Sequence, residues 1–150
     1  MVILRGDDMA ALNKNMFLVG TNGAVWVNGQ LLSNIKKIEL KLTGSFEDVS
    51  VIDNYGTFAV FTGYSGDGTV TLQKVDSYVV NLLSDAYKTG VMPDITIISR
   101  LTNKATGKTE RIAVKDVSFT EYFLANYESK GLIEEAIPLK FSGFEVLDTI

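Results

Sequence analysis

Residues 34–44 read NIKKIELKLTG, and charged and apolar side chains alternate strictly from Lys37 to Leu42. Ile38, Leu40 and Leu42 fall on one side of an extended chain, because successive side chains of a β-strand point to opposite faces. Lys37, Glu39 and Lys41 fall on the other side. The period of two therefore predicts a strand with one buried face and one face in water.

The flanking sequence also predicts strands. Residues 24–32, AVWVNGQLL, place Asn28-Gly29 between two apolar runs, and Asn-Gly indicates a tight hairpin turn because both residues tolerate positive φ. Residues 57–64 (TFAVFTGY) and 68–75 (GTVTLQKV) predict two further strands. The chain thus begins as a series of short strands joined by turns.

A glycine-punctuated stretch, GYSGDGTVTLQK at residues 63–74, matches the first half of a phosphate-binding loop. In such a loop the second glycine is followed by Lys-Ser/Thr and then by a helix. Here Gly68 is followed by Thr69-Val70 and an alternating strand, so nucleotide binding is not indicated. The glycines favour a turn or bulge between two strands, or the close approach of another backbone.

One segment, residues 76–90 (DSYVVNLLSDAYKTG), has the period of a helix. Its apolar residues form a stripe, Asp76 or Ser77 can cap its start, and Gly90 ends it. The helix is expected to pack against the sheets through that stripe.

The second half of the chain predicts strands again. Residues 94–101 (DITIISRL) and 110–119 (ERIAVKDVSF) predict a hairpin, and residues 121–127 (EYFLANY) predict another strand. Residues 136–148 (AIPLKFSGFEVLD) close the chain, and Pro138 indicates a sheet edge or a bulge there.

These segments together predict a mainly β fold, an antiparallel β-sandwich or barrel with one flanking α-helix. The length of 150 residues suits a single domain covering 1–150. Within it we expect an irregular N-terminal arm at 1–20 and the helix at 76–90.

Residues 45–56, SFEDVSVIDNYG, are rich in apolar side chains but show no clear period. Ser45 and Asp48 match a helix capping box, yet no helical period follows, so we expect a long loop or a hairpin extension. Exposed apolar surface usually marks contact with partners. We expect five side chains of this segment to lie at an inter-subunit interface: Phe46, Val49, Val51, Ile52 and Tyr55.

Composition restricts the chemistry. The chain has no cysteine and no histidine, which excludes disulfides, thiolate catalysis and histidine bases, and we predict no catalytic, cofactor or metal site. Its net charge of −4 argues against a dedicated nucleic-acid binder.

The sequence shows no targeting or membrane-spanning segment. Charged residues interrupt the apolar start before a secretory core forms, and no apolar run approaches the ~20 residues of a membrane span. We therefore expect a soluble protein that stays in a cytoplasm.

The order of these features resembles that of the XkdM-like phage tail tube proteins, over about residues 22–150. This family includes proteins of contractile-tailed phages, PBSX-type defective prophages and phage-tail-like bacteriocins. The resemblance rests on five stretches in succession: GAVWVNGQLLSNIKKIELKL, GYSGDGTVTLQKV, SYVVNLLSDAYKTG, RIAVKDVSFTEYFLANYESKG and IPLKFSGFEVLD.

The resemblance implies a structural subunit without enzyme activity or cofactor. Such subunits form hexameric rings that stack into a hollow tube for DNA passage or envelope puncture. The implied partners are further copies of the chain and the tail sheath, baseplate and tape-measure proteins, with DNA only transiently and non-specifically in the lumen and no membrane span. The implied location is the virion tail, assembled in the cytoplasm of the bacterial host.

On this interpretation the polar faces of two strands line the channel. The expected lumen-facing residues are Lys37, Glu39, Lys41, Thr69, Thr71 and Gln73. Two other function classes stay open from the residues alone. One is a β-sandwich module that binds a glycan or a protein through its aromatic side chains, and the other is a carboxylate-dependent hydrolase.

Overall fold

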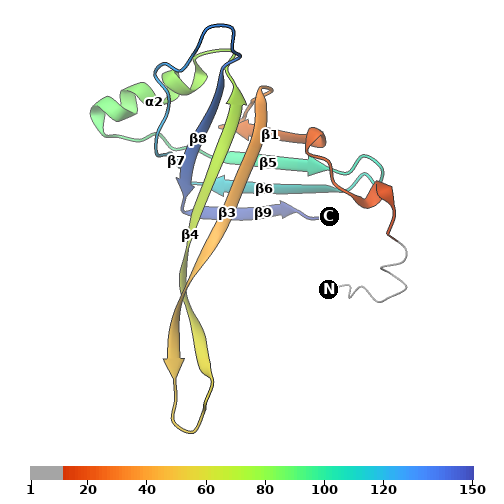
Figure 1. The fold of residues 1–150 in the computed structure, drawn as a ribbon, viewed down its shortest axis with the longest axis vertical. Helices are drawn as coiled ribbons and strands as arrows, with labels where there is room; N and C mark the ends of the chain where they lie inside the picture. Colours follow the sequence, from red (N-terminus) through yellow and green to blue (C-terminus); the bar gives the residue numbers. More distant parts are fainter. Residues whose placement is uncertain (1–11) are drawn as a thin grey trace.

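The structure, a computed structural model, describes residues 12–150, which form two antiparallel β-sheets and one α-helix (Figure 1). The first sheet contains β1 (Gly23–Val27), β2 (Gln30–Leu31), β5 (Ile97–Thr102), β6 (Thr109–Lys115) and β9 (Gly143–Asp148). The second contains β3 (Ile35–Ser50), β4 (Thr57–Gln73), β7 (Ser118–Phe119) and β8 (Glu134–Phe141). The α-helix is α2 (Tyr78–Thr89), and two short 3-10 turns, η1 (Lys14–Met16) and η2 (Gly20–Asn22), precede β1.

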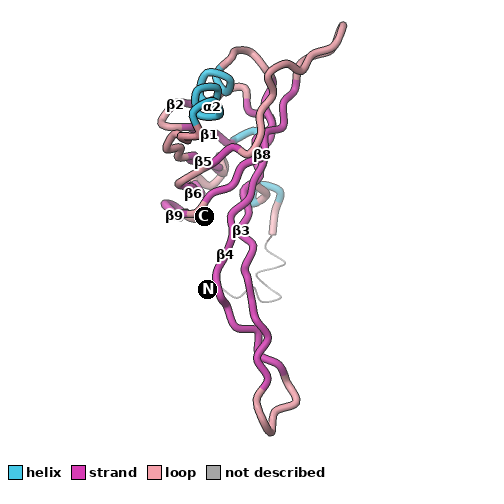
Figure 2. The backbone as a smooth tube through the Cα atoms, turned by 90° about the vertical axis from the view of Figure 1, so that its left-hand side faces the viewer, coloured by secondary structure: helices cyan, strands magenta, loops and turns pink. Residues whose placement is uncertain are grey.

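The strand order is β2-β1-β5-β6-β9 in one sheet and β3-β4-β8-β7 in the other. The two sheets form separate layers, and their strands run across one another (Figures 1 and 2). Such crossed packing is one of the two ways in which sheets stack. The predicted fold class, mainly β and antiparallel with a flanking helix, is confirmed.

The core fills the space between the sheets. Val25 and Ile97 of one sheet meet Val70, Ile137 and Leu139 of the other, and all are buried. Helix α2 closes one end of this core through its buried residues Leu83 and Ala86. The face of β3 that alternation predicts to be buried does pack here, through the half-buried Ile38 and Leu40.

Two local predictions are also confirmed. Asn28 (φ 51°) and Gly29 (φ 82°) form the turn between β1 and β2, both with positive φ. Helix α2 begins where the Asp76 carboxylate accepts the Tyr78 backbone N–H at 3.1 Å, and it ends at Gly90, whose φ is 79°.

The predicted break between 57–64 and 68–75 is wrong, because β4 is one continuous strand from Thr57 to Gln73. The glycines in it allow close packing instead of a turn. A side chain at Gly66 would collide with the ring of Phe141, which lies opposite it on β8. The predicted close approach of another backbone occurs at Gly68, where a Cβ would collide with the Glu39 carbonyl of β3, and a bulge, the other predicted feature, lies next to Gly63.

The strand predicted at 121–127 is absent, since this segment is irregular in the structure. Its aromatic and β-branched composition favours a strand only where a neighbouring strand is available. The closing segment, predicted as one strand, divides at Ser142 into β8 and β9, which belong to different sheets. Pro138 sits near an edge: β7, the outermost strand, is only two residues long.

Candidate assembly surfaces

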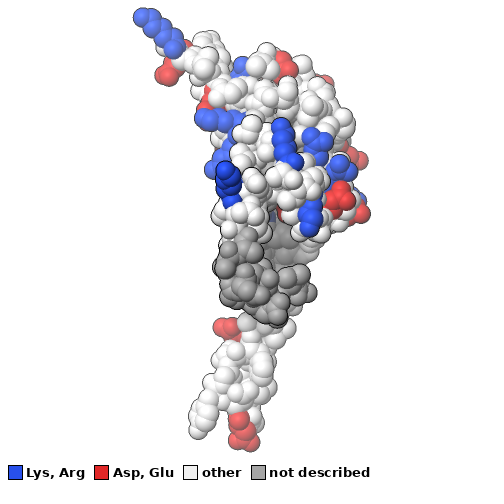
Figure 3. Space-filling model, turned by 90° about the vertical axis from the view of Figure 1, so that its right-hand side faces the viewer, with Lys and Arg blue, Asp and Glu red and all other residues white. Residues whose placement is uncertain are grey.

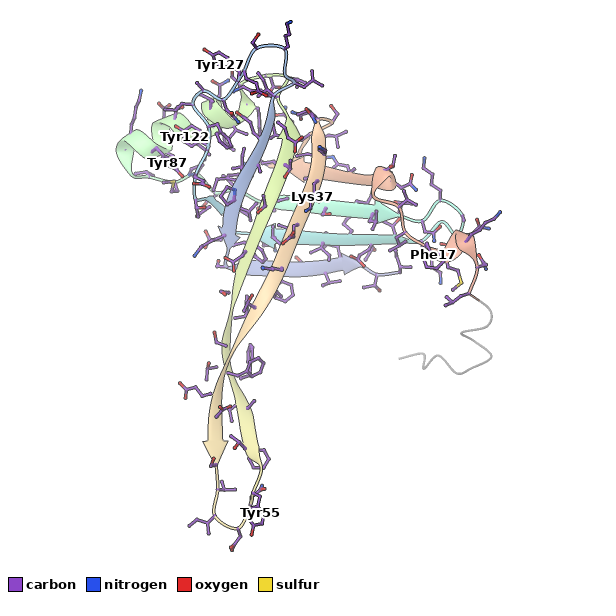
Figure 4. The ribbon with its side chains drawn as sticks, viewed as in Figure 1. Phe17, Lys37, Tyr55, Tyr87, Tyr122 and Tyr127 are labelled. Carbon is purple, nitrogen blue, oxygen red and sulfur yellow. The ribbon has the colours of Figure 1, made fainter. Side chains whose placement is uncertain are left out.

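Strands β3 and β4 continue well beyond the body as a two-stranded ribbon, which we call the hairpin arm (residues 43–64) (Figures 1 and 2). Strand β8 pairs with β4 only from Gly66 onward, so within the described residues the arm has no third strand. The segment predicted as a loop or hairpin extension forms its end, and residues 45–50 are strand, not loop. Tyr55 lies at the tip (Figure 4).

A β-bulge interrupts the arm near its base. Ser45 pairs with Gly63 and the next residue, Phe46, pairs with Phe61, so Thr62 is an extra residue on β4. The Thr62 hydroxyl donates to the Ser45 carbonyl at 3.0 Å, and Gly63 has φ 154°. A bulge bends a strand pair and increases its twist, which directs the outer part of the arm away from the body.

Apolar side chains lie on both faces of the arm. Residues directly opposite in an antiparallel pair share a face. Phe46 and Phe61 are opposite one another, with ring centroids 5.5 Å apart, and Val49 is opposite Phe58 on the other face, beside Val60. All five are exposed, by between 41% and 59%. A ribbon that kept one face in water would alternate apolar and polar residues, so both faces of this arm suit burial against a partner.

All five side chains predicted at an interface lie on this arm and are exposed in the single chain. Ile52 is 94% exposed at the turn, and its neighbours Val51 and Tyr55 are also in water. The returning strand, 57–64, is predicted as a strand, but the predicted interface does not include its exposed side chains Phe58, Val60 and Phe61. The signal was present in the uninterrupted apolar run Phe58-Ala59-Val60-Phe61, which is typical of a strand covered on both faces.

The charge of the arm has one sign. It carries Glu47, Asp48 and Asp53, and no lysine or arginine lies within residues 43–64. The lower part of Figure 3 accordingly shows a mostly uncharged surface with a few acidic atoms. A like-charged copy of the arm is therefore a poor partner for it, and an apolar or basic surface is a better one.

The six residues predicted to line a channel lie together on the face of the second sheet that points away from the core. Lys37 is opposite Thr71 and Glu39 is opposite Thr69 in the β3–β4 register. The residues that alternate with them, such as Val70, point into the core. The structure thus brings the six onto one surface, while their place in a channel stays a prediction.

This outer face mixes charges of both signs. The Lys36 ammonium lies 2.8 Å from the Glu134 carboxylate across β4, and that of Lys37 lies 3.9 Å from Glu39. Lys41 is opposite Asp67, which in turn is opposite Lys140 on β8. A polyanion meets little net attraction on such a surface, since phosphate binding depends on uncompensated lysine and arginine.

The same sheet has two open edges. Strand β3, sixteen residues long, is its edge strand on one side. On the other side β7 pairs only with Leu139 and Lys140 of β8, which leaves Glu134–Ile137 without a partner strand in the described part of the chain. Long open edges expose unpaired backbone groups that pair readily with another chain.

The aromatic side chains considered for glycan binding do not form one platform. Tyr55 lies at the arm tip, whereas Tyr122 packs edge-on against Tyr87 beside α2, with centroids 5.0 Å apart (Figure 4). Trp26 stacks under Arg100 on the first sheet, 5.0 Å from its guanidinium carbon. Burial, with smaller contributions from Tyr122 and Glu121, raises the pKa of Tyr87, whose hydroxyl donates to the Phe119 carbonyl at 2.7 Å. Tyr87, Tyr122 and Trp26 therefore pack within the chain, whereas Tyr55 is fully exposed.

Among residues 12–150, no group of three or more Asp or Glu side chains lies close enough together to hold a metal ion. Across the same residues, no helix has the length and apolar character needed to cross a bilayer.

Comparison with known proteins adds sequence and fold relationships. The family model described as "Phage tail tube protein" matches residues 10–148. The Phage-like element PBSX protein XkdM of Bacillus subtilis (strain 168) is 30% identical over 138 residues, which cover 91% of this chain and 94% of that protein.

Two solved structures share the fold at low sequence identity. A chain of the sheath–tube complex of the extracellular contractile injection system PVC, in its extended state, matches with a TM-score of 0.70 and 10% identity, over 97% of this chain and 99% of that one. The SPP1 tail tube matches with a TM-score of 0.64 and 15% identity, over 89% and 80%.

Proposed function

The chain belongs to the phage tail tube protein family, and we propose that six copies of it close into a ring and that such rings stack into a hollow tube. Its role is that of a structural subunit in the tail of a phage or phage-like particle. The observation that carries the proposal is the hairpin arm, because a single copy leaves both of its apolar faces in water.

In the proposed ring, the second sheets of neighbouring copies join edge to edge. The free edge of β3 in one copy pairs with the open part of β8 in the next, and closure removes the exposed edges. The core-facing sides of the joined sheets stay covered by the first sheet and α2. Their outer faces, with Lys37, Glu39 and Thr71, then form one continuous hydrophilic wall.

The arm is the second contact. A two-stranded hairpin in water is marginally stable at best, so an arm of this length gains most of its stability from neighbours. We place Phe46, Val49, Val51, Ile52 and Tyr55 between copies, because burial of both faces requires partner surface on both sides. The sheet edges of the body thus close the ring, and the arm forms the second contact between neighbouring copies.

The tube interior passes DNA, or a cargo delivered through an envelope, without retaining it, since its wall carries mixed charges. The outer surface and the tube ends engage tail sheath, baseplate and tape-measure proteins during assembly in the host cytoplasm. The role requires no catalysis and no cofactor, and a sequence without histidine or cysteine suits it.

The test of this proposal is a charge on the arm. Val51→Asp places a carboxylate in a surface that assembly is proposed to bury, so assembly should be lost in sedimentation velocity and electron microscopy. The isolated chain should keep its fold and lose less than about 0.5 kcal/mol of stability, because the position is exposed. Ser33→Asp, which adds the same charge on an exposed turn of the body, is the control and should assemble normally. Normal assembly of Val51→Asp would contradict the role given to the arm.

A further inference from the structure

The segment between β7 and β8, residues 120–133, carries a second set of exposed apolar side chains. It is irregular in the structure, although it contains an aromatic and aliphatic run. Leu124, Tyr127 and Leu132 are 75%, 78% and 93% exposed, and we call these three residues the end patch. Exposed apolar side chains that gather on one segment mark a contact with a partner.

Backbone hydrogen bonds hold both ends of this segment on the body. The Thr120 N–H donates to the Pro138 carbonyl at 3.1 Å, and the Lys74 N–H donates to the Ile133 carbonyl at 2.8 Å. Lys74 directly follows the last residue of β4. The end patch is therefore carried at a fixed place, beside the point where β4 ends.

The hairpin arm lies at the other end of the same strand. Strand β4 starts within the arm at Thr57, and its seventeen residues span about 55 Å at ~3.3 Å per residue. Tyr55 at the arm tip and Tyr127 in the end patch accordingly lie at opposite ends of the longest axis of the molecule (Figures 1 and 4). Each copy thus presents one apolar surface at each end of this axis.

The two surfaces differ in charge. The arm carries only acidic residues, whereas the turn within the end segment places the exposed Lys130 next to Gly131 with φ 63°. The Glu128 side chain folds back over Gly131, and Glu121 lies near Tyr87 at the start of the segment. Lys130 is the basic group of this turn, so the arm of another copy suits the end patch better than a second end patch does.

We propose that the arm tip of one copy, residues 51–55, docks on the end patch of a copy in the next ring. The inference rests on the proposed function, because it names the surface that receives the arm. Strands of a closed barrel run obliquely along its axis. Strand β4 therefore directs the arm out of its own ring on one side and holds the end patch on the other side.

Such a contact joins two different surfaces head to tail. Head-to-tail contacts that do not close on themselves build open filaments, as stacking of rings into a tube requires. Ile52, which is 94% exposed, and the fully exposed Tyr55 then pack against Leu124 and Leu132. Lys130 faces the acidic arm, and both apolar surfaces leave water together.

Cross-linking tests this contact, because the chain has no cysteine of its own. The full chain carries Ile52→Cys and Leu132→Cys together, and the assembled protein is treated with a short bismaleimide. The two thiols of one copy are separated by the length of β4, so the reagent should join different copies only. Links that pass from ring to ring should give a ladder on a denaturing gel that continues beyond six copies. A ladder that stops at six would place the contact within one ring and would overturn the proposal.

The matched control pairs Ile52→Cys with Val91→Cys, an apolar position after α2 that is 75% exposed, and it should give no ladder. Electron microscopy of the same samples separates the two levels of the account. Tubes without a ladder from the 52/132 pair would overturn this contact and leave the proposed function standing, whereas absence of tubes from the unsubstituted chain would contradict both.

A charge on the end patch gives a second readout that needs no thiol. Leu132→Asp should abolish tubes in electron microscopy, while Val91→Asp should form them normally. Both positions are exposed, so both variants should keep the fold of the single chain. Normal tubes from Leu132→Asp would overturn the proposal.

Discussion

The absence of a side chain at Gly68 allows β3 and β4 to pack closely at this point. A Cβ at this position of β4 would collide with the Glu39 carbonyl on β3 and would lie 2.8 Å from a methyl group of Leu40. The obstacle is mainly backbone, which moves only at the expense of the β3–β4 ladder. A loss of stability is therefore expected from even the smallest added side chain.

Gly68→Ala should accordingly lower the free energy of unfolding by about 1–3 kcal/mol, measured by urea denaturation. Gly20→Ala is the control, since a Cβ there meets nothing within 4 Å. That control should change stability by less than about 0.5 kcal/mol. Equal unfolding midpoints for the two variants would show that the strands relax around the added methyl group.

A second residue-scale prediction concerns the Lys74–Glu135 pair. Glu135 is 3% exposed in the core region, and its carboxylate lies 3.5 Å from the Lys74 ammonium. Lys74→Met leaves this buried carboxylate without its partner and should cost about 3 kcal/mol. Lys115→Met removes an equivalent pair with Glu145 at the surface, 3.0 Å apart and about half exposed, and should cost at most about 1 kcal/mol. Chemical denaturation at neutral pH compares the two, and similar losses would contradict a special role for burial.

At the scale of the element, the arm behaves differently from the body. Its residues contact little besides the partner strand, whereas β8 is paired on the β4 side and buries every second side chain. Local stability follows such contacts, and two-stranded ribbons in water open readily.

Amide hydrogen exchange should therefore be fast in residues 43–64 of the unassembled chain and slow in Ile137 and Leu139 of β8. After assembly, exchange in the arm should slow by at least about tenfold, while exchange at Leu139 of β8, which is already paired with both β4 and β7, changes little. An arm that is already protected in the unassembled chain would mean that it is stable without neighbours.

Secondary-structure elements could be predicted where a short sequence pattern by itself determines the local backbone or the buried face. Alternation in 34–44 gave the buried face of β3, and Asn28-Gly29 gave the first hairpin. The continuity of β4 was not predictable, because Gly66 and Gly68 fit a turn as well as a crowded strand. The prediction of a strand at 121–127 was wrong because the composition of a segment does not show whether a neighbouring strand is available to pair with it.

The hairpin arm was the element that the sequence predicted least completely. Its residues indicated contact with a partner, but neither the length of the ribbon nor its projection from the body follows from a period in the sequence. The six polar residues of the outer sheet face were placed on one surface correctly by alternation. Which surface a channel uses depends on other copies, and that is information a single chain does not contain.

At the scale of the whole molecule, the outer face of the second sheet is predicted to face a channel. A thiol introduced by Thr71→Cys, at the centre of that face, should react with a small reagent in assembled tubes and be shielded from one too bulky to enter. Free subunits should react with both reagents. Labelling by the bulky reagent at the same rate in tubes and in free subunits would place this face on the outside.

The central claim is that the chain assembles through its open sheet edges and its apolar arm into a hollow six-fold structure. Negative-stain electron microscopy of the concentrated protein tests this most directly. The account predicts rings or tubes with a central channel and six-fold end views. A protein that stays strictly monomeric, without rings, up to its highest soluble concentration would contradict it.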